Sequence, residues 1–319
     1  MKRVWVYILV LCVAISAMVI SCKKSSDQGS KVSDAAALSS LLGSLHAAPY
    51  TLSVQAGKDA IVYCARSTRL HFYPNSFKDG VGRAVSSGTV AVTVTEVYNT
   101  SDLISHYINT GTTYSLFGCS GAVNIEALIN GQPVYADRYS IGFTQPEASN
   151  KSAQLFYGYV GADSLVSWSQ NYFPNSGTSA ASTSIDGSGS NFYRYQLDSC
   201  TSFNWVCCGR LAINTAPKTN VQIVLPDTTF NALNTRVFIV LPDDKIIVSA
   251  TIASAGTFTL LSGALVPTGA SYEIVVLAAK KGVYYYAQST GTVTDGLTLH
   301  PSLMATAKEN IMSALVALR

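Results

Sequence analysis

The feature that most constrains the fold is a period-two alternation of apolar and polar residues that recurs along the chain. Residues 88–97 place three valines on one face of an extended strand and smaller or polar residues on the other. Residues 123–130 repeat the alternation, and the pair Asn130-Gly131 is typical of a tight hairpin turn. A second hairpin is predicted around residues 242–244. The sequence therefore predicts a mostly β chain with two antiparallel, sandwich-like domains.

Two segments have the spacing of helices. Residues 34–45 are rich in alanine and leucine. Residues 302–318 form a C-terminal candidate, and their apolar stripe consists of Met304, Ala307, Ile311, Leu315 and Leu318. We expect this short C-terminal helix to pack on the last sheet, and a partner-binding helix is the alternative.

The N-terminus has the pattern of an exported lipoprotein. Lys2 and Arg3 precede an apolar run over residues 4–20, and a small residue stands directly before Cys22. We predict a signal peptide over residues 1–21, lipid attachment at Cys22, and a polar tether over residues 22–48 that includes a short helix. A retained membrane-spanning anchor is the alternative. The predicted location is the outer membrane, with the lipid as the membrane contact, on either the periplasmic face or the cell surface.

Composition and motifs exclude several classes of function. Charged residues make up 12% of the chain and the net charge is +3, so nucleic acid is not an expected partner. The four histidines are scattered and are expected at the surface, and no cofactor or metal motif is found. No spacing joins two of the carboxylates that could serve a glycosidase, which are Glu96, Glu126, Asp137, Asp163 and Asp186. The sequence therefore predicts no catalytic residues.

Tyrosine is the better functional hint, because the chain has 18 of them and few charges. Tyrosine rings stack on sugars and suit protein interfaces. Beside a Ser/Gly-rich loop over residues 176–190, we predict a binding surface made of Tyr172, Tyr193, Arg194 and Tyr195. The alternative is that these rings are half-buried cover for a sheet.

Several motifs in series carry a resemblance. Residues 70–104 contain an apolar strand, Pro, Phe, a Gly-containing turn and a Val-rich strand, and residues 119–134 contain a strand followed by Asn-Gly. Residues 153–170 run from Phe-x-Gly to Trp, and Trp205 begins a Trp-x-x-Cys motif. This series resembles uncharacterised Bacteroidota outer-membrane lipoproteins with a ZU5-like β-domain. The resemblance implies a ZU5-like domain over residues 49–206 and a second β-domain over residues 207–319. It supplies no activity. Gly209 departs from it, because the family motif reads Trp-x-x-Cys-Asp-Arg.

Five cysteines remain after the signal peptide and the lipidated residue are set aside. Cys207 and Cys208 are neighbours in a predicted strand, so they should point to opposite faces, which disfavours a shared metal. If residues 203–204 form a hairpin tip, Cys200 faces Cys207 at a separation that suits a disulfide. In the resemblance Cys208 matches the motif cysteine and the others are additional. This implies a second bridge, Cys64–Cys119, and a buried thiol at Cys208.

Two classes of function are compatible with these patterns. The favoured one is a lipid-anchored, non-catalytic module that binds or displays a glycan or an envelope protein. The alternative is an envelope hydrolase, glycosidase-like, whose site has no sequence motif. A binding module predicts exposed aromatic rings without convergent carboxylates, whereas an enzyme predicts a cleft with at least two titratable groups.

Overall fold

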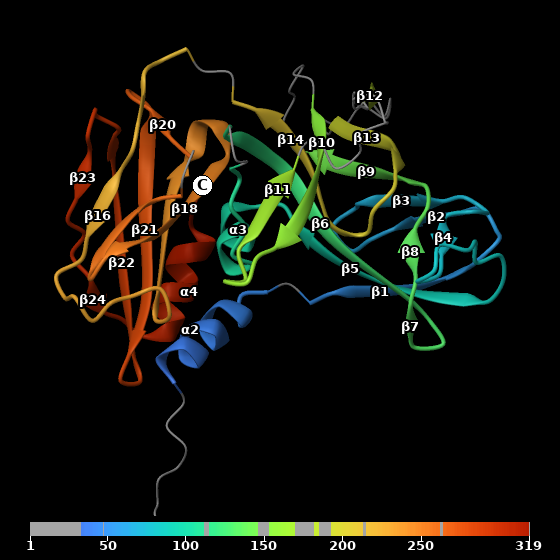
Figure 1. The fold of residues 1–319 in the computed structure, drawn as a ribbon, viewed down its shortest axis with the longest axis horizontal. Helices are drawn as coiled ribbons and strands as arrows, with labels where there is room; N and C mark the ends of the chain where they lie inside the picture. The colour runs from blue at the N-terminus through green and yellow to red at the C-terminus, as the bar shows by residue number, and fades with distance from the viewer. Residues whose placement is uncertain are drawn as a thin grey trace, which may run out of the picture. The chain divides into compact units, whose positions relative to one another are not determined.

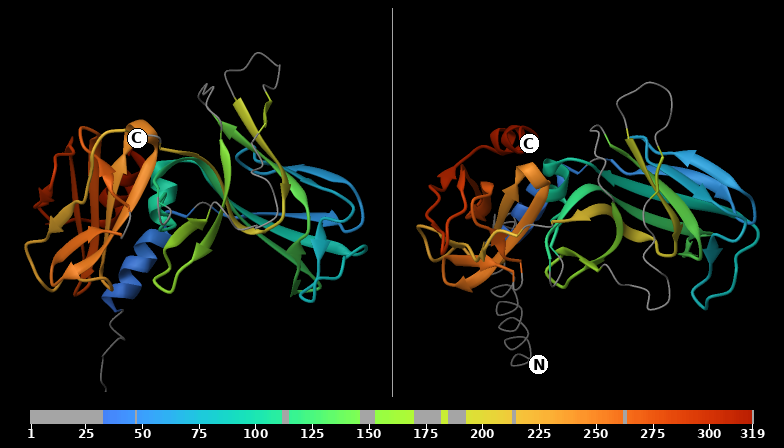
Figure 2. Two further views of the ribbon diagram at one scale, coloured as in Figure 1. Left: turned by 45° about the horizontal axis from the view of Figure 1, so that its top comes forward. Right: turned by 90° about the horizontal axis from the view of Figure 1, so that it is seen from above.

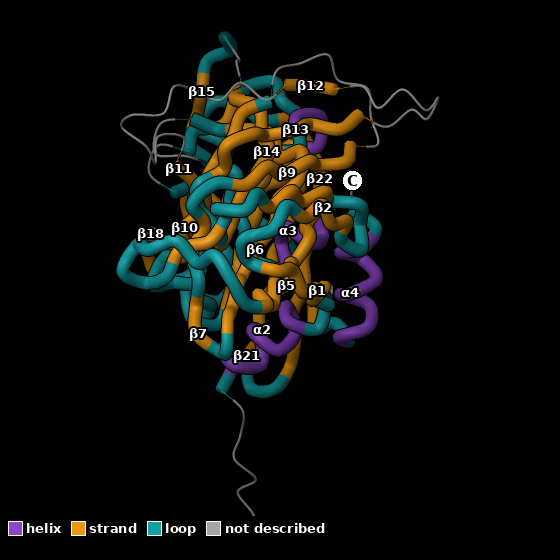
Figure 3. The backbone as a smooth tube through the Cα atoms, turned by 90° about the vertical axis from the view of Figure 1, so that its right-hand side faces the viewer, coloured by secondary structure: helices purple, strands orange, loops and turns teal. Residues whose placement is uncertain are grey.

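Antiparallel β-strands make up most of the chain, and the few helices are short (Figure 3). The computed structural model describes residues 33–46, 48–111, 115–145, 153–169, 182–184, 193–212, 215–261 and 264–318. The mostly β prediction is confirmed. Residues 34–319 form one compact unit. The predicted signal peptide, Cys22 and the start of the tether lie outside the described residues.

The first sheet has seven strands in the order β1-β5-β6-β14-β10-β11, with β7 paired to β6. Their bounds are β1 Tyr50–Gln55, β5 Thr89–Val97, β6 Phe117–Ile129, β7 Gln132–Pro133, β10 Gln154–Val160, β11 Val166–Ser169 and β14 Asn204–Leu211. The valines of β5 point into the core, as their alternation predicts. Asn130 and Gly131 both have positive φ and join β6 to β7, which confirms the first hairpin.

The second sheet has five strands in the order β12-β13-β9-β3-β2. Their bounds are β2 Ala60–Tyr63, β3 Arg69–Phe72, β9 Tyr139–Gln145, β12 Ser182–Ser184 and β13 Tyr193–Cys200. A separate ribbon pairs β4 (Phe77–Lys78) with β8 (Tyr135–Ala136). Side chains from the first and second sheets share one buried cluster, the sandwich core, which includes Val92, Ile125, Leu70 and Phe143. This pair of sheets fits the predicted sandwich.

The third sheet has eight strands in the order β23-β16-β19-β18-β17-β21-β22-β24 (orange and red in Figure 2). Their bounds are β16 Gln222–Val224, β17 Thr235–Leu241, β18 Ile246–Ser254, β19 Thr257–Leu260, β21 Ser271–Lys280, β22 Val283–Thr292, β23 Thr298–Leu299 and β24 Met304–Ala305, with β15 (Lys218–Thr219) pairing β20 (Val266–Pro267) beside it. The second predicted hairpin is confirmed, because the 3-10 turn Pro242–Asp244 joins β17 to β18. The expected boundary at residue 206/207 falls inside β14, and both neighbours of β14 belong to the first sheet.

Three helices are described: α2 (Asp34–Gly43), α3 (Thr100–Ser105) and α4 (Lys308–Val316). Both predicted helices are therefore found, although α4 begins six residues later than predicted and Met304 lies in an exposed strand. The sequence patterns did not indicate α3, which begins where the side chain of Asn99 accepts a hydrogen bond from the backbone N–H of Asp102.

The helices pack on the face of the first sheet that is turned away from the sandwich core (Figure 1). Leu41 of α2, Ile104 of α3 and Ile311 of α4 share a second buried cluster, the helical core, with side chains of the first and third sheets. This cluster physically joins the two parts that the sequence suggested as separate domains.

Strand β14 contributes side chains to both cores. Val206 and Cys208 belong to the sandwich core, and Trp205 and Cys207 belong to the helical core. The prediction that Cys207 and Cys208 occupy opposite faces is confirmed. Among the described residues, no helix is long and apolar enough to cross a bilayer.

Candidate functional site

The first cysteine bridge predicted from the sequence, Cys200–Cys207, is wrong. Cys200 ends β13 in the second sheet and pairs with Tyr139, whereas Cys207 lies in β14 of the first sheet. The chain crosses between the sheets over residues 201–203, and positive φ values at Ser199 and Asn204 redirect the backbone on either side of the crossing. A short connection that resembles a hairpin is therefore an arch between two sheets.

The second predicted bridge, Cys64–Cys119, is wrong for a related reason. Cys64 belongs to the sandwich core and Cys119 to the helical core, so the first sheet separates them. The described cysteines are all buried free thiols. The two sulfurs that do meet are those of Cys119 and Cys207, at 3.2 Å. Cys208 is fully buried, as predicted, and burial raises the pKa of its thiol well above the usual value.

The binding surface predicted beside the Ser/Gly-rich loop is not supported. Tyr195 is 2% exposed and belongs to the sandwich core, so it cannot offer its ring to a ligand. Tyr172, the loop residues 176–181 and 185–190, and the side chains of Tyr193 and Arg194 lie outside the described parts of the chain. Residues 284–286, three further tyrosines, are half-buried cover on β22.

The carboxylates considered for a glycosidase pair make separate local contacts and are not paired with one another. Glu96 is buried and accepts hydrogen bonds from the backbone N–H groups of Arg66 and Thr68. Asp163 accepts from the backbone of Leu165 within a turn. Asp137 lies 3.9 Å from the ammonium group of Lys78. Asp186 lies outside the described residues.

The expectation that the four histidines are scattered is wrong for one pair, in which His46 is exposed, as expected, and His106 is half-buried. His46 and His106 stack with ring centroids 3.9 Å apart, and the edge of His106 meets Trp205. Burial, and then the neighbouring His46, lower the pKa of His106 to about 4. The described residues contain no cluster of three metal-ligating side chains.

A groove lies where β14 begins between two neighbours that extend past its first residues. Asn204, the first residue of β14, pairs with Ile125 of β6, and Trp205 pairs with Gly158 of β10. Both neighbours run on beyond these pairs, to Ile129 and Val160. The missing stretch of strand leaves two adjoining cavities at this end of the first sheet.

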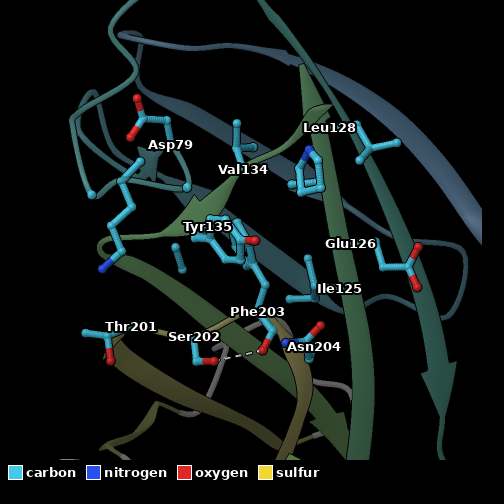
Figure 4. A pocket seen from close by; sticks show the side chains of 16 residues that line it. Asp79, Ile125, Glu126, Leu128, Val134, Tyr135, Thr201, Ser202, Phe203 and Asn204 are labelled. Carbon is cyan, nitrogen blue, oxygen red and sulfur yellow. Dashed lines mark hydrogen bonds between the residues drawn. The ribbon is translucent and has the colours of Figure 1, made fainter. Parts of the chain in front are cut away.

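The first cavity has a volume of about 630 Å³ and lies between β6, the β4–β8 ribbon and the crossing segment (Figure 4). The second has a volume of about 430 Å³ and lies between β6 and β10, with Trp205 among its lining residues. Both are lined by Glu126, Ser202 and Asn204, so we treat them as one site, the β14 groove.

Aromatic rings stand on both sides of the β14 groove. Tyr135 in the first cavity is 50% exposed, and Tyr159 in the second is 54% exposed. Gly158 lies close to two tryptophans. A Cβ atom there would come within 2.6 Å of the Cβ of Trp205 and 2.9 Å of the ring of Trp168. The glycine thus lets both tryptophans pack beneath this part of the groove.

Polar groups occupy the middle of the β14 groove. The side-chain oxygen of Asn124 is buried in the lining of the second cavity and has no hydrogen-bond partner in the described structure. Buried acceptors without a partner are uncommon, and the surrounding groups close this oxygen off from solvent. The exposed side chains of Glu126 and Asn204 lie beside it.

Asp79, the other carboxylate of the groove lining, is committed to its own loop. It accepts hydrogen bonds from the backbone N–H groups of Arg83 and Val81 and from the Arg83 guanidinium, and the Arg83 N–H in particular lowers the pKa of its carboxyl. Figure 4 shows Asp79 and Glu126 on opposite sides of the first cavity, with Val134 and Tyr135 between them. The two carboxylates do not converge.

Sequence reasoning missed Tyr135, Tyr159, Asn204 and Asn124 as groove residues, although it named Glu126. Tyr135 follows the Asn-Gly hairpin closely, which could have placed it near a sheet edge. The groove itself has no sequence signal, because it depends on where β14 begins relative to its neighbours.

No protein-family model matches this chain, and a comparison with curated proteins finds no significant relative. The resemblance to lipoproteins with a ZU5-like domain therefore stays a prediction, and the function rests on the geometry of the site.

Proposed function

We propose that this chain is a lipid-anchored protein of the cell envelope that binds a neutral glycan, without catalysis, in the β14 groove. The observation that carries the proposal is that two exposed rings, Tyr135 and Tyr159, line adjoining cavities that share the exposed side chains of Glu126 and Asn204. Ligand sites are concave and combine aromatic surface with a few placed polar groups, which is the composition found here.

The chemistry of a sugar matches both components. The C–H faces of a pyranose ring cover an aromatic ring, and an exposed tyrosine loses little conformational entropy when it is covered. Sugar hydroxyls donate hydrogen bonds to exposed acceptors such as the Glu126 carboxylate and the Asn204 amide oxygen. The same carboxylate would repel an anionic glycan, so the proposal specifies a glycan without carboxylate or sulfate groups.

The alternative, an envelope hydrolase, needs two carboxyl groups about 5 to 9.5 Å apart on either side of one bond. Within the described lining of the second cavity, Glu126 is the sole carboxylate. Asp79 lines only the first cavity and is held by Arg83. A single exposed carboxylate supports binding better than acid–base catalysis.

The binding test compares two tyrosine variants of equal exposure. Tyr159→Ala removes a ring from the groove, whereas Tyr63→Ala removes a ring on β2 that is also 54% exposed and does not line the groove. Calorimetric titration uses a neutral oligosaccharide that the wild-type chain binds. It should show at least a tenfold loss of affinity for Tyr159→Ala and no change for Tyr63→Ala. Equal affinities for all three proteins would refute the assignment of the site.

A hydrolysis assay separates the alternative function. The wild-type chain and Glu126→Gln are incubated with the same oligosaccharide, and the products are resolved by chromatography. We expect intact oligosaccharide in both cases. Cleavage by the wild type that stops in Glu126→Gln would establish the hydrolase instead.

Anchoring is tested by metabolic labelling with a radioactive fatty acid in cells that express the full chain. Label should be incorporated into the wild type and lost in Cys22→Ser. An unlabelled wild-type protein that keeps its N-terminal segment would favour the retained membrane anchor. Protease treatment of intact cells then assigns the face of the outer membrane.

A further inference from the structure

We propose that Cys119 and Cys207 form a disulfide that joins β6 to β14 beneath the helical core. Their sulfur atoms lie 3.2 Å apart in the thiol form. Bond formation brings them to about 2.0 Å, a closure of about 1 Å that side-chain rotation and a small strand shift can supply. The occurrence of this bond in the cell rests on the proposed export of the chain, but its geometry does not.

A β-bulge at Ser120 is what brings the two cysteines to one face. Cys208 pairs with Gly121, and the next residue, Gly209, pairs with Cys119, so Ser120 has no partner on β14. With uninterrupted alternation, Cys119 would face the sandwich core together with Val123. Because the bulge reverses the phase, Cys119 faces the helical core instead, beside Cys207.

The surroundings of this pair suit a structural bond. Cys119 is 5% exposed and Cys207 is 0% exposed, among the rings of Phe117, Phe156 and Trp205. Burial, and then the adjacent Cys119 thiol, raise the pKa of Cys207 well above its usual value. A protonated, buried thiol exchanges slowly, so the bond should form before the core closes and then resist reduction in the folded protein.

The reaction is an exchange with a small-molecule or protein disulfide. The thiolate of one cysteine attacks the oxidant, whose S–S bond breaks and releases one thiol, and a mixed disulfide forms. The second cysteine then attacks the protein sulfur of that mixed disulfide and releases the second thiol. The two cysteines lose two protons and two electrons, and the oxidant is reduced to two thiols.

The test uses the full chain, denatured, reduced and refolded in a buffer of reduced and oxidised glutathione. Free thiols are alkylated in denaturant, and peptides are analysed by mass spectrometry without reduction. We expect a cross-linked peptide that joins Cys119 to Cys207, with Cys64, Cys200 and Cys208 alkylated. A bond between any other pair, glutathione adducts alone, or alkylation of both Cys119 and Cys207 would overturn the proposal.

Variants check the assignment by a different measurement. Among Cys64, Cys119, Cys200, Cys207 and Cys208, Cys119→Ser should raise the number of alkylated thiols from three to four, whereas Cys64→Ser should lower it to two. The folded wild type should also keep its cross-link in millimolar dithiothreitol and lose it after denaturation. Because wild-type peptide mapping gives a result even if a variant misfolds, the proposal remains testable. Labelling at Cys22 is scored separately, so failure of anchoring leaves this outcome unaffected.

Discussion

Replacement of Gly209 by alanine is expected to lower the free energy of unfolding by about 2–3 kcal/mol, near the upper end of the cost of overpacking a core. A Cβ atom at this position would lie 2.5 Å from Cδ2 and 2.9 Å from Cε2 of Phe117. Because carbon atoms pack at about 3.5–4.0 Å, the ring would have to retreat by about 1 Å.

The ring of Phe117 has no room to retreat. It is fully buried and stacks on Phe156 at 4.2 Å with an interplanar angle of 8°. The edge of Trp168 meets it at 6.0 Å. The strain must therefore pass to the backbone of β14 or β6. In the resemblance to ZU5-like lipoproteins, Gly209 stands where their Trp-x-x-Cys-Asp-Arg motif has Asp. The same contact with Phe117 would exclude an aspartate at this position.

The assay is equilibrium unfolding in urea, followed by the fluorescence of the buried tryptophans. In a parallel thermal melt the midpoint should fall by about 4–6 °C, because the compact unit of residues 34–319 is large and shifts by only about 2 °C per kcal/mol. Gly43→Ala is the matched control, because no atom lies within 4 Å of its added Cβ and its φ is not positive. That control should stay within about 1 kcal/mol of the wild type or exceed it.

A double-mutant cycle identifies the cause. In a Phe117→Ala background, which itself costs about 3–5 kcal/mol, Gly209→Ala should cost almost nothing, because its Cβ would enter the vacated space. A Gly209→Ala variant as stable as the wild type, or one whose cost is unchanged when Phe117 is absent, would refute the reasoning.

Three further predictions concern stability. Burial, and then His46, lower the pKa of His106 to about 4 in the folded chain, whereas in the unfolded chain it returns to the ordinary histidine value of 6.5. The unfolded chain therefore binds the extra proton between these values, and stability should fall as pH falls from about 6.5 to about 4; His106→Asn should flatten this part of a pH series of urea melts. Arg66→Met should cost about 1–3 kcal/mol, because it strips the guanidinium partner from the mostly buried carboxylate of Asp102, and a smaller loss in Asp102→Asn/Arg66→Met than in Arg66→Met alone checks this cause. Ile311→Ala should cost about 2–5 kcal/mol and loosen α4 from the helical core, because Ile311 is fully buried; hydrogen exchange should then rise in α4, and unchanged exchange would contradict its docking role.

Much of the fold could be predicted from the sequence because the information is local. The alternation of β5 places its valines in the core, and Asn130-Gly131 sets the hairpin after β6. Strand alternation also places Cys207 and Cys208 on opposite faces. In each case, residues that are adjacent along the chain determine the outcome.

The failures share a different cause, which is that strand partners are chosen over long sequence separations. The crossing from Cys200 to Asn204 has the length of a hairpin, but its two strands join different sheets. The bulge at Ser120 reverses the alternation of β6 and moves Cys119 away from the core that holds Cys64. The β14 groove depends on the same arrangement, since it opens where β14 begins short of its neighbours.

Glycan binding in the β14 groove is tested most directly by a glycan array. The array is probed with the full chain, with a Tyr135→Ala/Tyr159→Ala variant and with Tyr63→Ala. We expect the wild type and Tyr63→Ala to bind the same neutral glycans and the double variant to bind none of them. A wild-type chain that binds no glycan, or a double variant that binds as well as the wild type, would contradict it.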